Sequence, residues 1–361
     1  KPDIYFCNED ASGMEPRIQF CKEQGVQMFI HPRIPEKGLK ERTSTDMKAR
    51  LREMVLKEEE NLDLNDVNDF HTVFPWRLCF AGGWLDLKWC NEIYPGSVIT
   101  INIKHHPGIC DDLCGLATSS RKHAIKLWNG KLPKHLDAVT AAKYLYGAEN
   151  FEHFGKAKGP MKEWERVSYS AGSQDHIGLM FPGINRLNYT GQHWPSSVRH
   201  IMDKTIVEWL ESVLNIIKIP FESRPANFNS QRVNNLTDES ISLEKRVAMV
   251  KLLSDASDLV WKGITEMDSD AVGKGLSDTM KAWETMLPYT VDPYRGEDSE
   301  KSQQLREYWT KYDIPYTKGC LFSGAGGGYL MIISDSDEVI EGAMKIQINL
   351  DEICPNSTYE F

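Results

Sequence analysis

The sequence predicts an α+β fold, and three observations lead to that class. Short runs of buried-type residues flank turns near both ends of the chain, as expected of strands. Two glycine-rich turns adjoin such runs, one at residues 82–83 and one at residues 324–328. Apolar stripes with helical spacing recur between residues 196 and 288. The chain has 361 residues, which is enough for two domains with sizeable cores.

Residues 1–60 predict a small α/β segment. A strand–helix–strand pattern opens the chain, and Gly25 closes the helix. This pattern is typical of a parallel sheet. Residues 57–69 are acidic and polar, so we place a domain boundary there. The predicted elements are strands at 3–7 and 27–30, a helix at 15–25 between them, and a helix at 43–56 that opens with T-S-T-D.

The rest of the chain predicts a mixture of strands and helices. Ser196 and Ser197 can cap a long helix, and that helix should end before Pro220. Pro288 likewise stops the last of the long helices. In chain order, the predicted elements are strands at 74–80 and 97–103, helices at 119–128, 196–217, 243–260 and 272–287, and strands at 329–333 and 343–350.

Composition narrows the range of functions. Hydrophobic residues make up 41% of the chain and charged residues 26%, as in ordinary globular proteins. A net charge of −10 argues against a general nucleic-acid or membrane-surface binder, although it allows a local basic pocket for phosphate. No apolar stretch has transmembrane length and no signal peptide is visible, so the eight cysteines are expected to be reduced thiols in the cytoplasm. An oligomer is compatible with the sequence.

The glycine-dense turn near the C-terminus requires a physical reason. Residues 324–328 read G-A-G-G-G and lead directly into the buried-type run 329–333. Four glycines in five positions cost backbone entropy on folding. A loop without Cβ atoms allows the main chain to approach a phosphate or another segment closely. A tight entry into a strand would give the same residues, so both interpretations stand at this point.

Four segments resemble, in order, the motifs of the GHMP kinases. The resemblance is strongest to the sugar branch, the heptose and fucose kinases, and covers roughly residues 74–350. It implies a two-lobed GHMP-kinase-like fold, with lobes at 70–218 and 219–361, that uses ATP and Mg²⁺ to phosphorylate a hydroxyl of a sugar or sugar-like polyol. The segments are P-W-R-L-C-F-A-G-G-W-L-D at 75–86, G-L-A-T-S-S at 115–120, G-S-Q-D at 172–175 followed by F-P-G-I-N at 181–185, and S-G-A-G-G-G-Y-L at 323–330.

The resemblance also implies roles for individual residues. Asp175 and Arg77 are the implied catalytic residues, because Asp175 takes the place of the aspartate that accepts or orients the proton of the attacking hydroxyl. Arg77 can donate to sugar hydroxyls and Asp86 can accept from them. The implied substrate-binding residues are Asp86, Gly82, Gly83, Gly326 and Gly327. The implied nucleotide-binding residues are Gly115, Thr118, Ser119, Ser120 and Arg121, with Ser119 also a ligand of Mg²⁺.

Each of these residues also has a purely structural interpretation. Arg77 can bridge the two lobes, Asp86 can cap the turn after the glycines, and Asp175 can cap a helix beginning near residue 176. Ser119 and Ser120 can be an ordinary N-cap pair.

The chain departs from the family pattern in two ways. The family's phosphate loop usually reads G-L-G-S-S-S-A, whereas here Ala117 replaces a glycine and Arg121 follows the serines. Asp86 and Gly115 are only 29 positions apart, which leaves little chain for an adenine pocket. An alternative function is therefore a catalytically degenerate sugar-binding or scaffolding protein with the kinase fold.

The first 50 residues carry a second resemblance. Residues 4–10, 25–33 and 42–50 resemble the closing half of a cytidylyltransferase-type nucleotidyltransferase, in which a helix beginning S-T contributes to nucleotide binding. The H-x-G-H motif of the opening half is absent from this sequence. We therefore expect no transferase activity from these residues alone. A longer native chain, with a preceding segment, would be a bifunctional kinase and nucleotidyltransferase that makes an activated sugar.

Two further groups of residues have weaker interpretations. His105, His106, Cys110 and Cys114, with Cys90 and His123 nearby in the sequence, could supply zinc ligands, but C-x-x-x-C is not a standard zinc spacing and we do not expect a zinc site. Four tryptophans near the motifs could stack on a sugar ring or belong to the core. They are Trp84, Trp89, Trp128 and Trp194.

Overall fold

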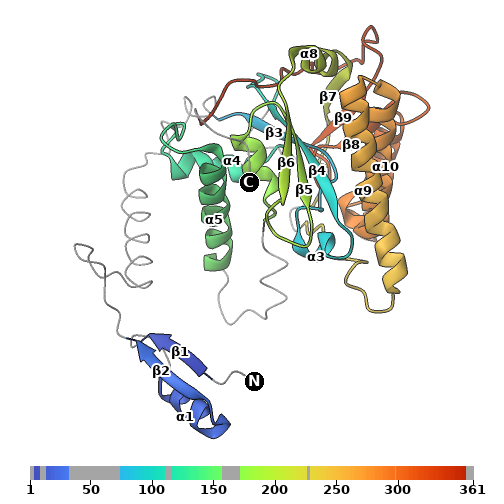
Figure 1. Ribbon diagram of the computed structural model, residues 1–361. Helices are drawn as coiled ribbons and strands as arrows, with labels where there is room; N and C mark the ends of the chain where they lie inside the picture. Colours follow the sequence, from blue (N-terminus) through green and yellow to red (C-terminus); the bar gives the residue numbers. More distant parts are fainter. Residues whose placement is uncertain are drawn as a thin grey trace. The chain divides into compact units, whose positions relative to one another are not determined.

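The computed structural model describes residues 4–8, 14–31, 74–109, 115–156, 171–225, 228–296 and 298–354 (Figure 1). The chain divides into two compact units, Lys1–Asp66 and Val67–Phe361. The described residues form both helices and strands, which confirms the predicted α+β class. No helix in these ranges is long and apolar enough to cross a membrane.

The first unit contains the predicted strand–helix–strand pattern. Strands β1 (Ile4–Asn8) and β2 (Gln27–His31) pair in parallel, with Ile4 opposite Gln27. Helix α1 (Met14–Gln24) connects them and ends at Gly25, whose φ of +62° suits a residue without a Cβ atom. The helix predicted at 43–56 lies outside the described residues, and the resemblance of this unit to a nucleotidyltransferase stays a prediction.

The second unit contains a four-stranded antiparallel sheet in the order β3-β4-β5-β6. The predicted strands at 74–80 and 97–103 are confirmed as the first two members of this sheet. The register of the two strands places Arg77, near the start of β3, opposite Asn102, near the end of β4, and both residues are buried. The four strands are β3 (Trp76–Ala81), β4 (Gly96–Ile103), β5 (Ile184–Tyr189) and β6 (Ser197–Ile201).

A second, three-stranded antiparallel sheet has the order β7-β9-β8. It consists of β7 (Leu214–Lys218), β8 (Gly319–Phe322) and β9 (Tyr329–Ile333), the last of which was predicted. The glycine-dense turn is therefore the connection of the β8–β9 hairpin. The strand predicted at 343–350 is wrong. That segment makes only isolated bridges, from Met344 to β7 and from Ile348 to β4.

The single helix predicted over 196–217 is also wrong. This stretch forms strand β6, helix α8 (Lys204–Val213) and strand β7. Asp203 begins the helix, because its carboxylate accepts hydrogen bonds from the backbone N–H groups of Thr205 at 2.9 Å and Ile206 at 3.2 Å. The apolar residues on either side are largely β-branched, and they pack in sheets rather than on a helix.

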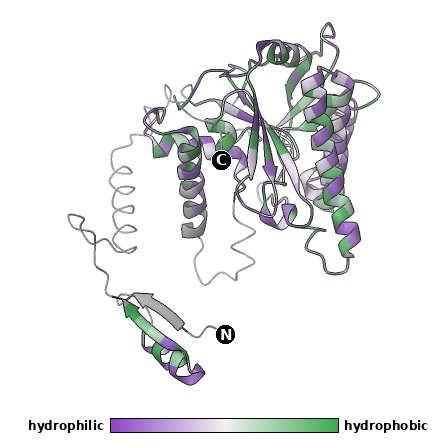
Figure 2. Ribbon diagram, in the orientation of Figure 1, coloured by the Kyte–Doolittle hydropathy of each residue, from purple (hydrophilic) through white to green (hydrophobic). Residues whose placement is uncertain are grey.

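Two long helices cover the sheets, as predicted. Helix α9 (Leu243–Glu266) packs against β4, and α10 (Ser269–Met286) packs against α9 and β8. The predicted stripe on α10 is buried, including Leu276 and Trp283. Figure 2 shows hydrophobic and hydrophilic residues interleaved along both helices, as amphipathic helices require.

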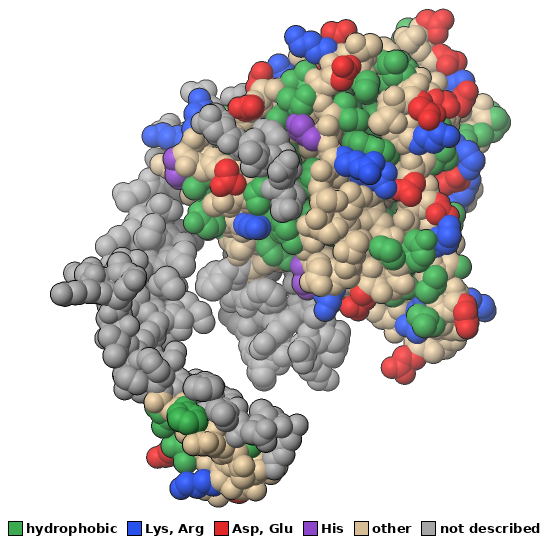
Figure 3. Space-filling view, in the orientation of Figure 1, with side chains coloured by type: hydrophobic (Ala, Val, Ile, Leu, Met, Phe, Trp, Pro, Cys, Tyr) green, Lys and Arg blue, Asp and Glu red, His purple; other side chains and the backbone are tan. Residues whose placement is uncertain are grey.

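The remaining helices are shorter and carry parts of the site. Helix α4 confirms the prediction at 119–128, and α7 holds the G-S-Q-D segment at its start. On the face shown in Figure 3, acidic and basic side chains of the second unit are interspersed. These helices are α3 (Lys88–Asn91), α4 (Thr118–Leu127), α5 (Ala138–Lys156), α7 (Gln174–Met180), the short 3₁₀ helix η2 (Pro288–Thr290) and α11 (Ser299–Thr310).

Candidate active site

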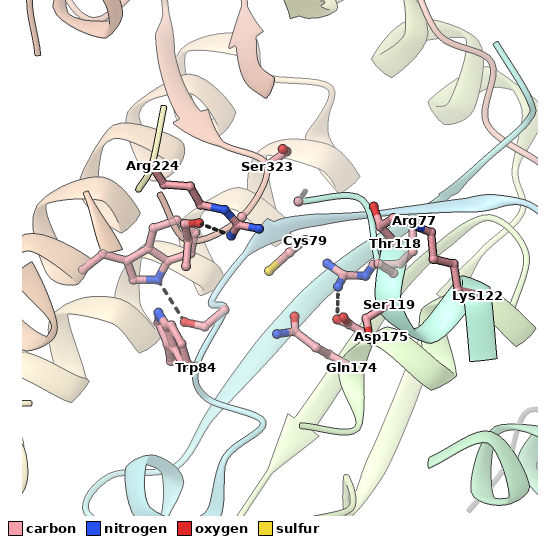
Figure 4. Close-up of a pocket in the computed structure, with 16 residues that line it drawn as sticks. Arg77, Cys79, Trp84, Thr118, Ser119, Lys122, Gln174, Asp175, Arg224 and Ser323 are labelled. Atoms are coloured by element: carbon pink, nitrogen blue, oxygen red, sulfur yellow. Dashed lines mark hydrogen bonds and ion pairs between the residues drawn. The ribbon is translucent and has the colours of Figure 1, made fainter. Parts of the chain in front are cut away.

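The four predicted motif segments meet around one cavity of about 530 Å³ (Figure 4). Strand β3, the turn after it, the start of α4, the start of α7, helix α10 and the β8–β9 turn all contribute to its wall. The cavity therefore joins segments that lie far apart in the sequence. The lining residues are Arg77, Cys79, Gly83, Trp84, Gly115, Ala117, Thr118, Ser119, Lys122, Gln174, Asp175, Arg224, Trp283, Ser323, Gly324 and Ala325.

An ion pair between Arg77 and Asp175 lies in the wall of this cavity (Figure 4). The Arg77 side chain is 5% exposed and that of Asp175 is 29% exposed, so only the carboxylate is open to solvent. Gly178 leaves room for the arginine, because a Cβ atom there would overlap Arg77 Cγ. Burial lowers the pKa of Arg77, although an arginine keeps its charge in a protein. Within the described residues, Nε and Nη1 of Arg77 are buried and make no hydrogen bond, so two donor groups of the guanidinium are unpaired in the wall of the cavity.

Two glycine-containing turns touch each other beside this ion pair. Gly115 has a φ of +99°, and a Cβ atom there would overlap Ser323 Oγ. Across the contact, a Cβ atom on Gly324 would lie 2.6 Å from Gly115 Cα. Both positions therefore require glycine. Of the buried side chains described, Ser323 is 1% exposed and its hydroxyl makes no hydrogen bond, which leaves it available at the cavity wall.

Ala117 precedes α4 in a left-handed conformation, with φ +58° and ψ +32°. Glycine adopts this conformation more easily, so the exchange of glycine for alanine preserves the shape of the turn at some cost in strain. Helix α4 begins at Thr118, and its N-cap residue Ala117 has no side chain that could accept a hydrogen bond from the first backbone N–H groups. Lys122, one turn further along, adds a positive charge to the lining. This end of the cavity is suited to an anion.

Replacing Ala117 with glycine tests this interpretation of the turn. Relief of about 1 kcal/mol of left-handed strain nearly offsets the loss of about 0.8 kcal/mol from one buried methyl group. We expect the free energy of unfolding in urea to change by less than about 1 kcal/mol. A loss of more than about 2 kcal/mol of stability would show that the methyl group is needed for packing.

Ser119 and Ser120 share a buried carboxylate that the sequence did not indicate. Ser119 Oγ donates to Glu149 Oε1 at 2.6 Å, and Ser120 Oγ donates to Glu149 Oε2 at 2.5 Å. His176 Nε2 lies 2.7 Å from the same Oε2. Glu149 is 3% exposed and His176 is fully buried, so the carboxylate is held in one orientation. It comes from α5, which carries no motif, and only the fold places it under the serines.

Asp86 lies behind the cavity wall. It is 2% exposed and accepts hydrogen bonds from the backbone N–H of Gln174 at 3.4 Å and from Gln174 Nε2 at 3.2 Å. Burial raises the pKa of Asp86. Its carboxylate thus caps the first turn of α7, the helix that carries Asp175. The structure places Gln174, rather than Asp86, on the cavity surface.

Several other predicted residues pack instead of lining the cavity. Arg121 is buried, where its Nε donates to Phe74 O at 3.0 Å and its guanidinium covers Trp76 at 4.1 Å. A Cβ atom on Gly82 would overlap Ser97 O, so this glycine serves close strand packing. Gly326 and Gly327 pack similarly, against the side chains of Phe228 and Ile219. Gly83, Gly324 and Ala325 are the members of the glycine turns that line the cavity.

Cationic, aromatic and thiol groups that carried no clear sequence signal complete the wall. Arg224 Nη1 donates to Ala325 O at 3.2 Å, which ties the loop after β7 to the glycine turn. Trp283 had appeared in the sequence only as part of a core stripe, and it both packs in the core and reaches the cavity. Burial raises the pKa of Cys79 to about 11, so this thiol is neutral.

The remaining sequence proposals concern metals. Cys110 and Cys114 lie outside the described residues. Within the described ranges, no group of three or more His, Cys, Asp or Glu side chains is arranged to hold a metal ion. Ser119 and Glu149 do offer hard oxygen donors side by side, which is the ligand type that Mg²⁺ prefers alongside phosphate oxygens.

Comparisons with known proteins gave structural likenesses only. No protein-family model and no curated protein sequence matches the chain. A heptose 1-phosphate kinase from Bacteriodes thetaiotaomicron aligns at 12% identity and a TM-score of 0.38, over 76% of this chain and 95% of that one. A protein from Campylobacter jejuni assigned as a sugar kinase aligns at 16% identity and a TM-score of 0.45, over 77% and 95%. Mevalonate diphosphate decarboxylase from Staphylococcus aureus aligns at 8% identity and a TM-score of 0.35, over 76% of this chain and 95% of that one. Likenesses at these levels carry no information on substrate or activity.

Proposed function

We propose that this chain transfers the γ-phosphoryl group of ATP to a hydroxyl group of a sugar. The observation that carries the proposal is the position of the Arg77–Asp175 ion pair, which lies in one cavity with the start of α4 and the Ser323–Ala325 turn. A carboxylate for the hydroxyl, a fixed positive charge and a helix N-terminus for phosphates are the groups that phosphoryl transfer requires.

The triphosphate would bind at the start of α4. Backbone N–H groups of Thr118 and Ser119 and the dipole of this ten-residue helix favour a negative charge there. Lys122 lies on the same end of the lining and can neutralise a phosphate oxygen. The contact between Gly115 and Gly324 keeps side chains out of this space, so that the main chain can lie close to the phosphates.

Mg²⁺ would be held by Ser119 and Glu149, together with phosphate oxygens and water. Bound there, the ion would neutralise charge that develops on the phosphate oxygens. The hydrogen bond from His176 to Glu149 Oε2 fixes the carboxylate, and Oε1 accepts the hydrogen bond from Ser119, so Mg²⁺ bound here would replace that hydrogen bond.

The acceptor hydroxyl would bind at Asp175. As the new bond forms between the hydroxyl oxygen and the γ-phosphorus, the bond from that phosphorus to the β-γ bridging oxygen breaks and ADP leaves. The hydroxyl proton passes to the Asp175 carboxylate and then to water. Arg77 stabilises the negative charge on the transferring group through the donors that its ion pair leaves unused.

Glu149→Gln tests the magnesium site. The amide keeps the size of the side chain but removes its charge, so we expect the affinity for Mn²⁺, used as a probe in place of Mg²⁺ in the presence of ATP, to fall about 10–100-fold by electron paramagnetic resonance. Glu284→Gln, which removes a carboxylate paired with Arg306 on the surface, is the matched control and should leave Mn²⁺ affinity unchanged. Equal Mn²⁺ affinity in the wild type and in Glu149→Gln would place the ion elsewhere.

A coupled assay for ADP release tests the function itself, with Mg²⁺, ATP and a panel of hexoses, deoxyhexoses, heptoses and polyols. We expect ADP release that depends on one class of sugar. Sugar binding without turnover and without ATP binding, measured by thermal shift, would instead support a degenerate sugar-binding protein. Residues 1–60 enter this proposal only as part of the nucleotidyltransferase half of a bifunctional enzyme. A nucleotidyltransferase assay on this chain, with the phosphorylated sugar as substrate, tests that part, and we expect no transfer without the H-x-G-H motif.

A further inference from the structure

Trp84 adopts a backbone conformation that disfavours a large side chain. Its φ is +86°, in the region that glycine occupies readily and other residues rarely. Such a conformation persists only when the surrounding structure imposes it, and strained residues of this kind cluster at ligand-binding sites. Here the strained residue lines the cavity and is partly exposed, so its side chain is available to a ligand.

The surroundings hold the Trp84 indole on a rigid support. Trp283 Nε1 donates to Gly83 O at 2.9 Å, which fixes the turn immediately before Trp84. Gly83 packs closely here, because a Cβ atom there would lie 2.7 Å from Cys79 Sγ and 3.0 Å from the Trp283 ring. The Trp89 ring lies behind, 6.3 Å from the Trp84 ring between centroids. The indole is thus a preorganised apolar surface.

Trp84 also lies on the side of the cavity where an acceptor must bind. Figure 4 shows Lys122 and Trp84 at opposite ends of the labelled residues, with Arg77 and Asp175 between them. The attacking and leaving oxygens of a phosphoryl transfer lie roughly in line. With the donor phosphates at α4 and the acceptor hydroxyl at Asp175, the rest of the acceptor extends toward Trp84.

Gln174 supplies a polar group in the wall of the same cavity. Its Nε2 donates to Asp86 Oδ1, and this hydrogen bond determines which way the amide points. Within the described part of the chain, the other amide atom, Oε1, is buried without a hydrogen-bond partner in the cavity wall. An unpaired acceptor and an aromatic face in one cavity match a sugar, which has hydroxyl donors on its rim and C–H groups on its ring faces.

We propose that Trp84 is the platform on which the pyranose ring of the acceptor stacks, with Gln174 Oε1 accepting a hydrogen bond from a ring hydroxyl. This inference rests on the proposed function and narrows the substrate from sugars and polyols in general to ring-form sugars. An open-chain polyol offers the same hydroxyl groups but no flat C–H face. Trp84 therefore determines specificity, and it touches the acceptor without taking part in the chemistry.

Calorimetry without nucleotide tests the platform on the full chain. The probes are D-glucose, D-galactose, D-mannose and L-fucose, each paired with its open-chain alditol. We expect at least one pyranose to bind about 10-fold or more tightly than its alditol. Trp84→Gly should abolish that preference and weaken the pyranose about 10-fold, while Trp84→Phe keeps affinity within about 3-fold of the wild type. Because glycine relieves the strained φ, the melting temperature of Trp84→Gly should stay within a few degrees of the wild type.

Met267→Gly is the matched control. Met267 also has a positive φ, +55°, but it follows α9 and does not line the cavity, so this variant should leave sugar affinity unchanged. If Trp84→Gly kept the wild-type preference for the pyranose over its alditol, the platform would be overturned. Equal losses of affinity for pyranose, alditol and ATP, together with a large fall in melting temperature, would overturn it as well. A wild-type chain that phosphorylates an alditol but binds no pyranose would overturn the platform and leave phosphoryl transfer intact. Pyranose binding that depends on Trp84, without any phosphoryl transfer, would support the platform and overturn the proposed function.

Discussion

Asp175→Asn should lower kcat by about 10²–10⁴-fold, because the amide cannot accept the proton of the attacking hydroxyl. The fold should survive this change. The amide oxygen can still accept a hydrogen bond from Arg77, whose side chain is only 5% exposed. Steady-state kinetics with the best sugar of the panel, together with thermal unfolding, measures both effects. We expect KM for the sugar to change by no more than a few-fold.

Two other variants separate chemistry from stability. Asp175→Ala leaves the buried guanidinium without its carboxylate and should cost up to about 3–5 kcal/mol of stability as well as activity. Asp258→Asn removes an aspartate that pairs with Arg186 at 2.5 Å, and this aspartate is 55% exposed and outside the cavity, so it should leave kcat unchanged. Full activity in Asp175→Asn would remove the assigned role of this carboxylate, whatever happens to the alanine variant.

Gly115→Ala should both destabilise the chain and abolish ATP binding. The new methyl group would overlap Ser323 Oγ and press against the β8–β9 turn, and alanine is strained at a φ of +99°. Backbone strain of about 1–2 kcal/mol and overpacking of about 1–3 kcal/mol together give a loss of about 2–5 kcal/mol. Urea unfolding and calorimetric titration with ATP measure the two effects.

Gly191→Ala measures the backbone strain alone, without the overpacking that adds to the stability loss of Gly115→Ala. Gly191 has a φ of +79°, and a Cβ atom there would meet nothing within 4 Å. Its substitution should therefore cost only the strain of about 1–2 kcal/mol and leave ATP affinity unchanged. If Gly115→Ala loses no more stability than Gly191→Ala and still binds ATP, the two turns are not the closely packed phosphate site proposed for them.

Much of the second unit could be predicted where local signals agreed. Strands β3 and β4 and helices α9 and α10 have strong apolar patterns bounded by turn or capping residues. Their predicted limits lie close to the observed ones, except that α9 continues past the predicted end at 260 to Glu266. The stretch 196–217 was misassigned because its apolar residues fit helical spacing throughout. The deciding signal was the Asp203 cap, which starts a helix in the middle of the run.

The site was only partly foreseeable, for a physical reason. Arg77, Asp175, Gly115 and Ser119 occur in motifs, and the fold brings them to one cavity. Glu149 could not be foreseen, because it comes from a helix without a motif and reaches the serines only through tertiary packing. Asp86 was expected at the substrate, but its burial and its contacts with Gln174 put it behind the wall. Side-chain direction at a turn is set by three-dimensional contacts that spacing does not encode.

A crystal structure of the chain with Mg²⁺ and a non-hydrolysable ATP analogue tests the central claim most directly. The account predicts that the triphosphate lies on the N-terminus of α4, between Gly115 and the Ser323–Ala325 turn, with its γ-phosphate facing the Arg77–Asp175 ion pair. A triphosphate bound anywhere else, or a γ-phosphate that Asp175 cannot approach, would contradict it.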